Sequence, residues 1–326
     1  MARYVSIRIV WAIIIVVGIV TVNFVLTHIL PGDVINALVG DFPAPKAYVD
    51  QLREQLGLDH PLYVQLWRYW IALLHGDLGF SFVNRQSVLS LILGRAGITL
   101  LLMLPALLVA SVAGVLLAIW IVPKAGGMAD SSLVALSLIG YSVPVFWLGQ
   151  ILILIFAVYL GWLPASGITS AREQATGWTW FLEYLRHLIL PGFCVSIYYA
   201  AVVVRITRSS MLEMFHQDFV LTARAKGLSD SAVLWRHVLR NSLIPVVTVI
   251  GYNFGYSLTG AILTETIFAW PGLGGLFVSS IEFKDFPVLS GIFLLAATTV
   301  VASNLITDIL YAVVDPRVRK AVIAKT

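Results

Sequence analysis

The residues best suited to binding chemistry lie in one basic stretch, LTARAKGLSDSAVLWRHVLRNSLIP, residues 221–245. Against a single acid, Asp230, it carries four cations and a histidine, namely Arg224, Lys226, Arg236, Arg240 and His237. Only 12% of the 326 residues are charged, so this density is unusual for the chain. Cations at this spacing bind anionic lipid headgroups or dock a soluble partner protein. The stretch is therefore the first candidate functional surface.

The same stretch is predicted to fold as a helix, a glycine turn and a second, short amphipathic helix. Gly227 breaks the first helix, and Ser229 or Asp230 can cap the second by accepting its free amide protons. At 100° per residue the second helix has an apolar arc of Leu234, Trp235, Val238, Leu239 and Leu243. The opposite arc holds Arg236, His237, Arg240 and Asn241. Pro245 would then open the next apolar run, and lipid binding and protein docking remain alternatives.

Other reactive residue types give no catalytic pattern. No GxxxxGK[ST] segment is present, so the chain is not expected to bind ATP by itself. The six histidines show neither HxxxH nor HExxH spacing, which argues against a metal site: His28, His60, His75, His187, His216 and His237. Cys194 is the only cysteine, so neither an internal disulfide nor a cysteine-based metal site can form. We expect a protein without catalytic residues, metal or cofactor of its own.

The elements that position these residues are apolar runs of membrane-spanning length. Apolar residues make up 59% of the chain and mean hydropathy is +0.92, well above soluble proteins. The runs do not alternate, which excludes a membrane β-barrel. The first run is too long for a signal peptide and is predicted to be an uncleaved span. Six spans are expected: Ile7–Thr27, Ile98–Val122, Leu133–Leu160, Leu188–Ile206, Ile244–Leu263 and Val288–Val314. Pro105 and Pro144 predict kinks in the second and third spans.

The distribution of Lys and Arg predicts the orientation. With the N-terminus inside, the short inner segments hold 13 of the 21 basic residues, which places both termini in the cytoplasm. The net charge of +4 is too small and scattered to indicate nucleic-acid binding. The predicted organisation is a first span (1–30), an outer helical loop (31–97), a five-helix core (98–314) with a cytoplasmic loop at about 207–243, and a cytoplasmic tail (315–326).

The outer loop is long enough to fold. Val49, Leu52 and Leu56 lie on one face of a predicted helix that ends at Gly57. A second predicted helix begins after Pro61 and carries an aromatic group suited to the membrane interface, Trp67, Tyr69 and Trp70. We expect a small helical cap outside the membrane.

An ordered set of motifs along nearly the whole chain resembles the permeases of ABC importers, specifically the dipeptide/oligopeptide/nickel family. TARAKGLS and RHVLRNSLIP resemble its cytoplasmic loop. The other matching segments follow in order: HILPGD, GDLGFSF, SVPVFWLGQILILIFAVYLGWLPASG, ETIFAWPGLGGL and NLITDILYAVVDPRVR. The long loop after the first span resembles the first (B-type) of two permease subunits. The acidic lead residue of the general loop is missing, and Arg240 stands where many importers have proline, as is usual for the peptide subfamily.

The resemblance implies an all-α, six-helix permease of the type I importer fold in a bacterial or archaeal cytoplasmic membrane. It implies a second, similar permease, two ATPase subunits that hold the ATP and Mg²⁺, and an extracytoplasmic substrate-binding protein. A coupling helix near Ser229–Arg240 would receive the ATPase, with Gly227 setting its angle. The implied coupling residues are Thr222, Ala223, Ala225, Gly227, Leu228, Ser229, Leu234, Trp235, Arg236, His237 and Arg240. Peptides are the expected substrates; a stand-alone secondary carrier or channel is the alternative, and a membrane enzyme lacks a catalytic constellation.

Polar residues within the predicted spans are further candidates. Asn253, Tyr256, Ser257 and Thr259 lie in the fifth span and either line the substrate pathway or hydrogen bond between helices. Gly251 and Gly255 are four residues apart, which favours close helix packing within this chain over gating. Asp308 is expected to pair with a basic group or lie near headgroups. Glu265 is expected at the outer end of span five, before WPGLGG, which resembles a tight re-entry or outer gate.

Overall fold

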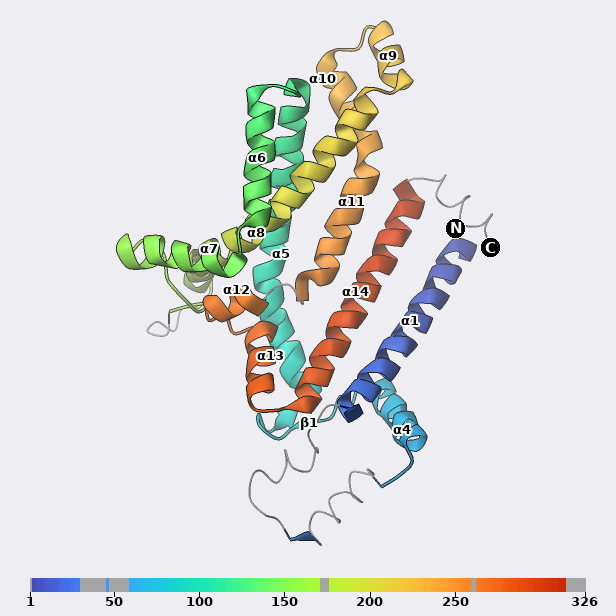
Figure 1. Ribbon diagram of the computed structural model, residues 1–326, viewed down its shortest axis with the longest axis vertical. Coiled ribbons are helices and arrows are strands. Elements are labelled where there is room, and N and C mark those ends of the chain that lie inside the picture. Colours follow the sequence, from blue (N-terminus) through green and yellow to red (C-terminus); the bar gives the residue numbers. More distant parts are fainter. Residues whose placement is uncertain (1, 30–44, 47–58, 171–175, 259–261, 315–326) are drawn as a thin grey trace.

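The structure is a computed structural model, and it describes residues 2–29, 45–46, 59–170, 176–258 and 262–314. Within these ranges the chain is almost entirely helical (Figure 1). Five helical segments are long and apolar enough to cross a membrane, and a sharply bent pair supplies a sixth if counted as one span. This agrees with the predicted all-α, six-span protein.

Four of the predicted spans correspond to long helices that extend beyond the apolar runs. They are α1 (Ala2–Ile29), α5 (Val88–Ile121), α8 (Trp178–Phe215) and α14 (Phe286–Val314). α5 begins ten residues before the predicted start because Ser87 caps it, accepting a hydrogen bond from the amide of Ser90 at 3.4 Å. Pro105 lies inside α5, where the sequence predicted it.

The third predicted span is broken rather than kinked. Its first half is α6 (Met128–Ser142), and its second half is α7 (Val145–Leu152) continued by a π-helical stretch, Ile153–Tyr159. The two halves meet at 96°. The break falls at Pro144 because proline disfavours the helical conformation of the residue before it. α7 therefore runs crosswise to α6 and projects from the side of the bundle (Figure 1).

The fifth predicted span is also divided. α11 (Arg240–Gly255) is followed by a 3₁₀ turn (Tyr256–Leu258), and the chain continues as α12 (Ile262–Ile267) and α13 (Leu273–Glu282). Pro245 does not open α11, as the sequence had suggested, but lies inside it. The helix instead begins at Asp230 and runs through α10 (Asp230–Ala232) and a π-helical stretch, Val233–Leu239, directly into α11.

The opposite end of the molecule from the basic stretch holds the short elements between α1 and α5 (Figure 1). α4 (Leu62–Leu74) begins after Pro61, as predicted, and is followed by a hairpin of β1 (Phe80–Ser81) and β2 (Gln86–Ser87). The helix predicted around Val49–Gly57 lies outside the described residues. α4 is tied to the bundle through a polar junction in which Asn23 donates to Tyr69 at 3.0 Å and to Ser290 at 2.6 Å.

The core of the bundle is the packing of α5 against α8. Gly114 lets the two backbones approach closely, since a Cβ there would lie 2.8 Å from the Cβ of Val203. Met103, Ala106 and Leu107 of α5 pack with Val195 of α8 in a buried apolar cluster. Small residues at such crossings are the usual means of close helix association in membranes.

Two ion pairs fasten the ends of the bundle. Arg208 of α8 donates to both carboxylate oxygens of Asp130 in the first turn of α6, at 2.5 and 2.6 Å. Bidentate pairs of this kind fix orientation as well as distance. Arg8 of α1 lies 3.3 Å from Asp308 of α14. This identifies the basic partner that the sequence predicted as one alternative for Asp308.

Candidate functional site

The basic stretch forms a compact loop at one end of the molecule, with α9 (Asp218–Ala225) and α10 joined by a tight turn (Figure 1). Gly227 adopts φ +81°, a conformation in which glycine is favoured. Its amide donates to the carbonyl of Arg224 at 2.9 Å. Ser229 caps the following helix by accepting from the amide of Ala232 at 3.3 Å. The predicted glycine break and serine cap are both present.

An apolar cluster holds this loop to the ends of two long helices. Val220 and Ala223 of α9 and Val233, Leu234 and Val238 after the turn are all buried. They pack with three buried residues from α5, α8 and the 3₁₀ turn after α5: Ile119, Met211 and Val122. Because the loop shares its core with the spans, a displacement of the loop must displace the ends of α5 and α8.

The predicted apolar arc of the second helix is buried at its centre, half-buried at Leu239 and Leu243, and wrong at Trp235. Leu234 and Val238 are buried, whereas half of the Trp235 surface is exposed. The cause is the π-helical stretch, Val233–Leu239. Its i→i+5 hydrogen bonds place more residues in each turn, so each residue rotates by less than the 100° used in the prediction. Val233 takes the buried position instead, and Trp235 joins the outer surface.

The outer surface of the loop combines cations with exposed apolar side chains. Its exposed members are Leu221, Thr222, Arg224, Ala225, Lys226, Gly227, Ser229, Trp235, Arg236 and Arg240. Leu228 and His237 are half-buried, while Ala223 and Leu234 belong to the supporting cluster. Asp230 pairs with Arg224 across the turn at 3.2 Å, and this is the only described ion pair within the loop. We call the exposed set the coupling surface, after the role that the resemblance implies for these residues.

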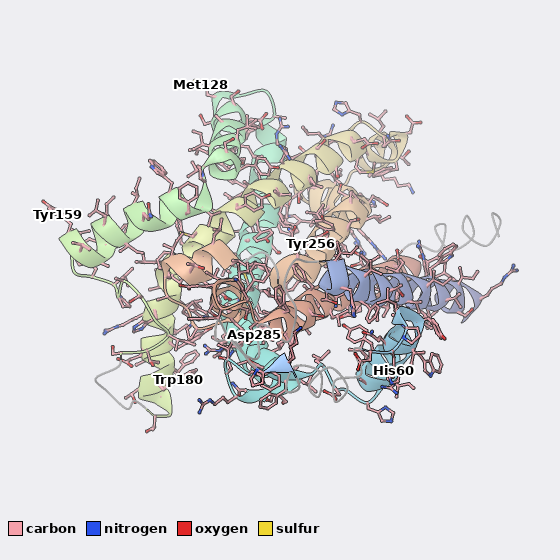
Figure 2. All side chains as sticks on the ribbon, turned by 60° about the horizontal axis from the view of Figure 1, so that its bottom comes forward. His60, Met128, Tyr159, Trp180, Tyr256 and Asp285 are labelled. Carbon is pink, nitrogen blue, oxygen red and sulfur yellow. The ribbon has the colours of Figure 1, made fainter. Side chains whose placement is uncertain are left out.

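The pathway candidates of the fifth span fall into different environments. Asn253 and Ser257 are buried within the chain, and the side-chain nitrogen of Asn253 has no hydrogen-bond partner among the described residues. Tyr256 is exposed and lies near the middle of the molecule (Figure 2). Thr259 lies outside the described residues. Of the three members that the structure describes, only Tyr256 presents its side chain to an open surface.

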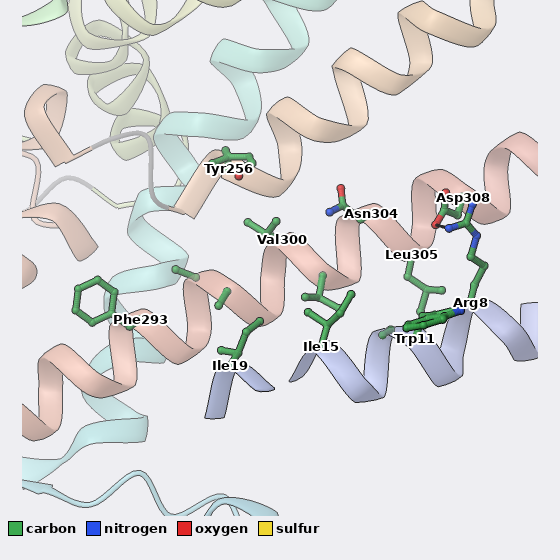
Figure 3. Close-up of a pocket in the computed structure, with 14 residues that line it drawn as sticks. Arg8, Trp11, Ile15, Ile19, Tyr256, Phe293, Val300, Asn304, Leu305 and Asp308 are labelled. Atoms are coloured by element: carbon green, nitrogen blue, oxygen red, sulfur yellow. Dashed lines mark ion pairs between the residues drawn. The ribbon is translucent and has the colours of Figure 1, made fainter. Parts of the chain in front are cut away.

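Tyr256 lines a cavity of about 490 Å³ between α1 and α14. Figure 3 shows Phe293 at one end of this cavity and the Arg8–Asp308 pair at the other, with Tyr256 near Val300 between them. Most of the wall between them is aliphatic, with Asn304 as the additional polar group. The cavity is therefore an apolar groove between two helices with its charges paired.

Gly251 and Gly255 serve close packing within the chain, as predicted. A Cβ on Gly251 would lie 2.2 Å from the hydroxyl of Thr307, and one on Gly255 would lie 2.9 Å from the Cβ of Ser303. Both contacts are with α14. The glycines thus bring α11 and α14 together, which is the packing role that the sequence favours.

Glu265 is the most enclosed acid of the described chain, with no exposed surface. Its carboxylate accepts hydrogen bonds from the hydroxyl of Thr99 and the amide of Gly274, both at 2.6 Å. Thr99 in turn accepts from the amide of Leu273 at 2.8 Å. The carboxylate thus caps the start of α13 from within α12. The sequence placed Glu265 at the outer end of the fifth span but did not predict its burial.

Glycines make room for this carboxylate. A Cβ on Gly272 would lie 2.3 Å from a Glu265 oxygen, and one on Gly274 would lie 2.6 Å from the Cα of Ile262. The WPGLGG segment therefore forms a tight turn around Glu265 between α12 and α13. The tight turn agrees with the sequence, whereas its role as a re-entry into the membrane or as an outer gate stays a prediction.

Comparison with known proteins identifies the family. A family model described as "Binding-protein-dependent transport system inner membrane component" matches residues 110–320. A second, for the N-terminal part of such membrane components, matches residues 1–103. Together they cover almost the whole chain.

Individual relatives align over nearly their full length. The di/tripeptide transport system permease protein DppB of Pseudomonas aeruginosa is 41% identical over 317 residues, which is 93% of this chain and 94% of the relative. The dipeptide transport system permease protein DppB of Escherichia coli K12 is 39% identical over 320 residues, with the same shares. A putative peptide transport system permease of Brucella abortus is 38% identical over 312 residues, covering 96% and 97%. This chain therefore belongs to the inner-membrane permease components of binding-protein-dependent transport systems.

Proposed function

We propose that this chain is the first of two permease subunits in an ATP-driven peptide importer. Its relatives are named as dipeptide, di/tripeptide and peptide permeases, which supports peptides as the substrate class. A second, similar permease completes the passage, and an extracytoplasmic binding protein delivers the substrate. Two ATPase subunits bind and hydrolyse ATP with Mg²⁺, and this chain contributes no catalytic group.

The observation that carries the coupling role is the mechanical attachment of the coupling surface. Its backing residues Val233, Leu234 and Val238 pack directly with residues at the ends of α5 and α8. A partner that binds the outside of the loop thereby acts on two spanning helices at once. Exposed arginines and Trp235 supply the residue types that are enriched at protein–protein interfaces.

The mechanism follows from this attachment. When the ATPases bind ATP and close, they move the coupling surface of each permease, and the attached helices change from an inward-open to an outward-open arrangement. Nucleotide and substrate each shift this equilibrium by their different affinities for the two states. The orientation that this requires, with both termini and the coupling surface in the cytoplasm, is the one that the basic residues support.

The test is reconstitution in liposomes. We expect peptide uptake that requires the second permease, the ATPases, the binding protein and ATP. Gly227→Pro removes a backbone donor to the Arg224 carbonyl, and proline cannot adopt φ +81°. Arg236→Glu reverses a charge on the coupling surface. Both changes should abolish peptide-dependent uptake while the protein still inserts in the membrane.

The control is Arg68→Glu, a charge reversal of an exposed arginine on α4 at the opposite end of the chain. This variant should have the same peptide uptake, and the same ratio of uptake to ATP hydrolysis, as the wild type. Uptake by this chain alone, driven by an ion gradient, would contradict the proposal and support a secondary carrier. Normal ATP-driven uptake by the protein carrying both Gly227→Pro and Arg236→Glu would contradict the coupling assignment.

A further inference from the structure

Five tyrosines from three helices and the 3₁₀ turn after α11 gather on one face of the bundle, and we call this group the tyrosine surface: Tyr141, Tyr198, Tyr199, Tyr252 and Tyr256. Tyr141 of α6 stacks on Tyr198 of α8 with ring centroids 5.2 Å apart. Tyr198 meets Tyr199 edge to face at 5.3 Å. The ring centroids of Tyr252 on α11 and Tyr256 in the 3₁₀ turn after it are 4.4 Å apart, and α11 packs against α8.

The depth of these residues is unusual for tyrosine in a membrane protein. Tyr252 is eight residues after Ile244, where the predicted fifth span begins, which places it about 12 Å along the helix at 1.5 Å per residue. That is well inside a hydrocarbon core of about 30 Å. Tyrosines of membrane proteins usually collect at the two interfaces. At mid-depth, exposed hydroxyls are costly against lipid and are expected to face protein or water.

Arg205 gives a second, independent indication that this face is wet. Its guanidinium carbon lies 5.4 Å from the ring centre of Tyr141. The adjacent Gly140 packs against Ile197 and Ala201, which lie one to two turns before Arg205 on α8. The arginine side chain therefore extends away from the cytoplasmic end and toward the tyrosines. A lipid-facing arginine near a helix end would extend the other way, toward the headgroups.

The arginine is also available for an anion. It is exposed, and among the described residues it forms no ion pair, in contrast to Arg8 and Arg208. Stacking on Tyr141 holds the guanidinium without using its hydrogen-bond donors for a carboxylate. A negatively charged group that passes along the tyrosine surface would meet this cation before it reached the cytoplasm.

The surface is also continuous with two hollows. Tyr198 and Tyr199 line a cavity of about 280 Å³ together with Thr264 of α12, next to the Glu265 turn. Tyr256 lines the cavity between α1 and α14 at the other side. The tyrosines thus extend from the neighbourhood of α12 to the cavity between α1 and α14.

We propose that the tyrosine surface and Arg205 are this chain's wall of the passage, and that they take a short peptide by its backbone and its terminal carboxylate. The proposal rests on the peptide importer function proposed above. Tyrosine offers a rigid aromatic face and a hydroxyl that both donates and accepts, so it can follow amide groups whatever the side chains are. Arg205 binds the carboxylate that every free peptide carries.

The first experiment compares radiolabelled Ala-Ala with its C-terminal amide in liposomes that contain the complete transporter. A charge-assisted hydrogen bond predicts that Arg205→Gln lowers kcat/KM for Ala-Ala by at least about tenfold and changes uptake of the amide much less. Tyr198→Phe and Tyr252→Phe should lower uptake of both peptides by roughly threefold to tenfold. Tyr63→Phe, an exposed tyrosine of α4 outside the tyrosine surface, is the matched control and should have no effect.

The two-peptide ratio separates recognition from folding, because a misfolded variant loses both substrates equally. An unchanged ratio in Arg205→Gln would overturn the carboxylate assignment. Unchanged uptake in both tyrosine variants would overturn the backbone assignment. If the wild-type transporter imports neither peptide, the proposed peptide function fails, and the peptide assignment of the surface fails with it.

The second experiment does not need transport. In a Cys194→Ala background, Tyr252→Cys should react with a membrane-impermeant maleimide in the assembled transporter. Leu108→Cys, which is equally exposed on α5 but in an aliphatic environment, should stay unlabelled. If Tyr252→Cys is labelled but the transporter imports no peptide, the tyrosine surface still faces water, and only the assignment of peptides as its substrate is refuted. Inert Tyr252→Cys would refute the passage itself.

Discussion

Replacing Glu265 with alanine gives the most direct test of the buried turn between α12 and α13. The carboxylate accepts hydrogen bonds from Thr99 and from the amide of Gly274. Removing it leaves both donors buried and unpaired, which costs about 1–3 kcal/mol for each group. The loss is therefore roughly 2–6 kcal/mol of folding free energy, before any contribution from the cavity that is left.

Glu265→Gln should cost less, because the amide oxygen still accepts one of the two hydrogen bonds. Its NH₂ group, however, would face the remaining donor. We expect a loss of about 1–3 kcal/mol, between the wild type and the alanine variant. The order wild type, Gln, Ala is therefore the specific expectation.

The assay is thermal unfolding of the purified protein in detergent, followed by tryptophan fluorescence. Trp270 is buried beside the turn and donates to the carbonyl of Ile98 at 2.9 Å, so it reports on this region. Because unfolding of membrane proteins is commonly irreversible, apparent midpoints are compared at one fixed scan rate. Glu282→Ala, at the exposed end of α13, is the control and should not shift the midpoint. A midpoint of Glu265→Ala equal to that of the wild type would refute the structural role of the carboxylate.

Three further variants test the backbone, helix packing and an ion pair. Gly227→Ala has space for its Cβ but must keep φ +81°, so it should destabilise by about 1–2 kcal/mol, seen as a lower unfolding midpoint. Gly251→Ala places a Cβ 2.2 Å from the Thr307 hydroxyl. This overpacking should lower the free energy of unfolding by about 1–3 kcal/mol and so lower the unfolding midpoint. Asp130→Asn leaves the partly buried Arg208 without its counter-charge and should destabilise by roughly 1–3 kcal/mol, reduced from the fully buried case because Arg208 is about one quarter exposed.

Each of these variants has a matched partner. Gly227→Asn should be tolerated better than alanine, because asparagine adopts positive φ more readily. Adding Thr307→Ala to Gly251→Ala should recover stability, and Gly18→Ala in open space should be neutral. Asp230→Asn breaks the exposed pair with Arg224 and should change stability by less than about 1 kcal/mol. Equal effects of Asp130→Asn and Asp230→Asn would contradict the distinction between the two pairs.

Features governed by local sequence were predictable. Span number follows from apolar length, the turn at Gly227 and the cap at Ser229 follow from residue type, and glycines four apart predicted close packing. The sequence predicts only a kink at Pro144, whereas the structure has a 96° break. Proline indicates that the helix bends, but the angle depends on what α7 packs against. α7 rests on α12, where Gly149 contacts Phe268 and Ile267.

Features that depend on irregular helix geometry or on long-range contacts were not predictable. Trp235 was misplaced because nothing in a helical periodicity reveals a π-helical stretch. The enclosure of Glu265 depends on Thr99, which is 166 residues away. The tyrosine surface was missed for a similar reason, since its members are spread over three helices and only Tyr256 lay in the polar set of one span. The mid-span position of Tyr198 and Tyr252 in the sequence was the available signal.

The crosswise course of α7 bears on the lifetime of the chain in the cell. Its far end carries exposed apolar side chains, with Val158 and Tyr159 among the most exposed of the described residues. In an orphan copy lipid alone covers this end, whereas docking against another subunit would hold it in place, and a loosely held segment is more open to proteolysis. We therefore expect the abundance of this chain to follow that of its neighbours in the complex, so that unequal synthesis of subunits is corrected by degradation.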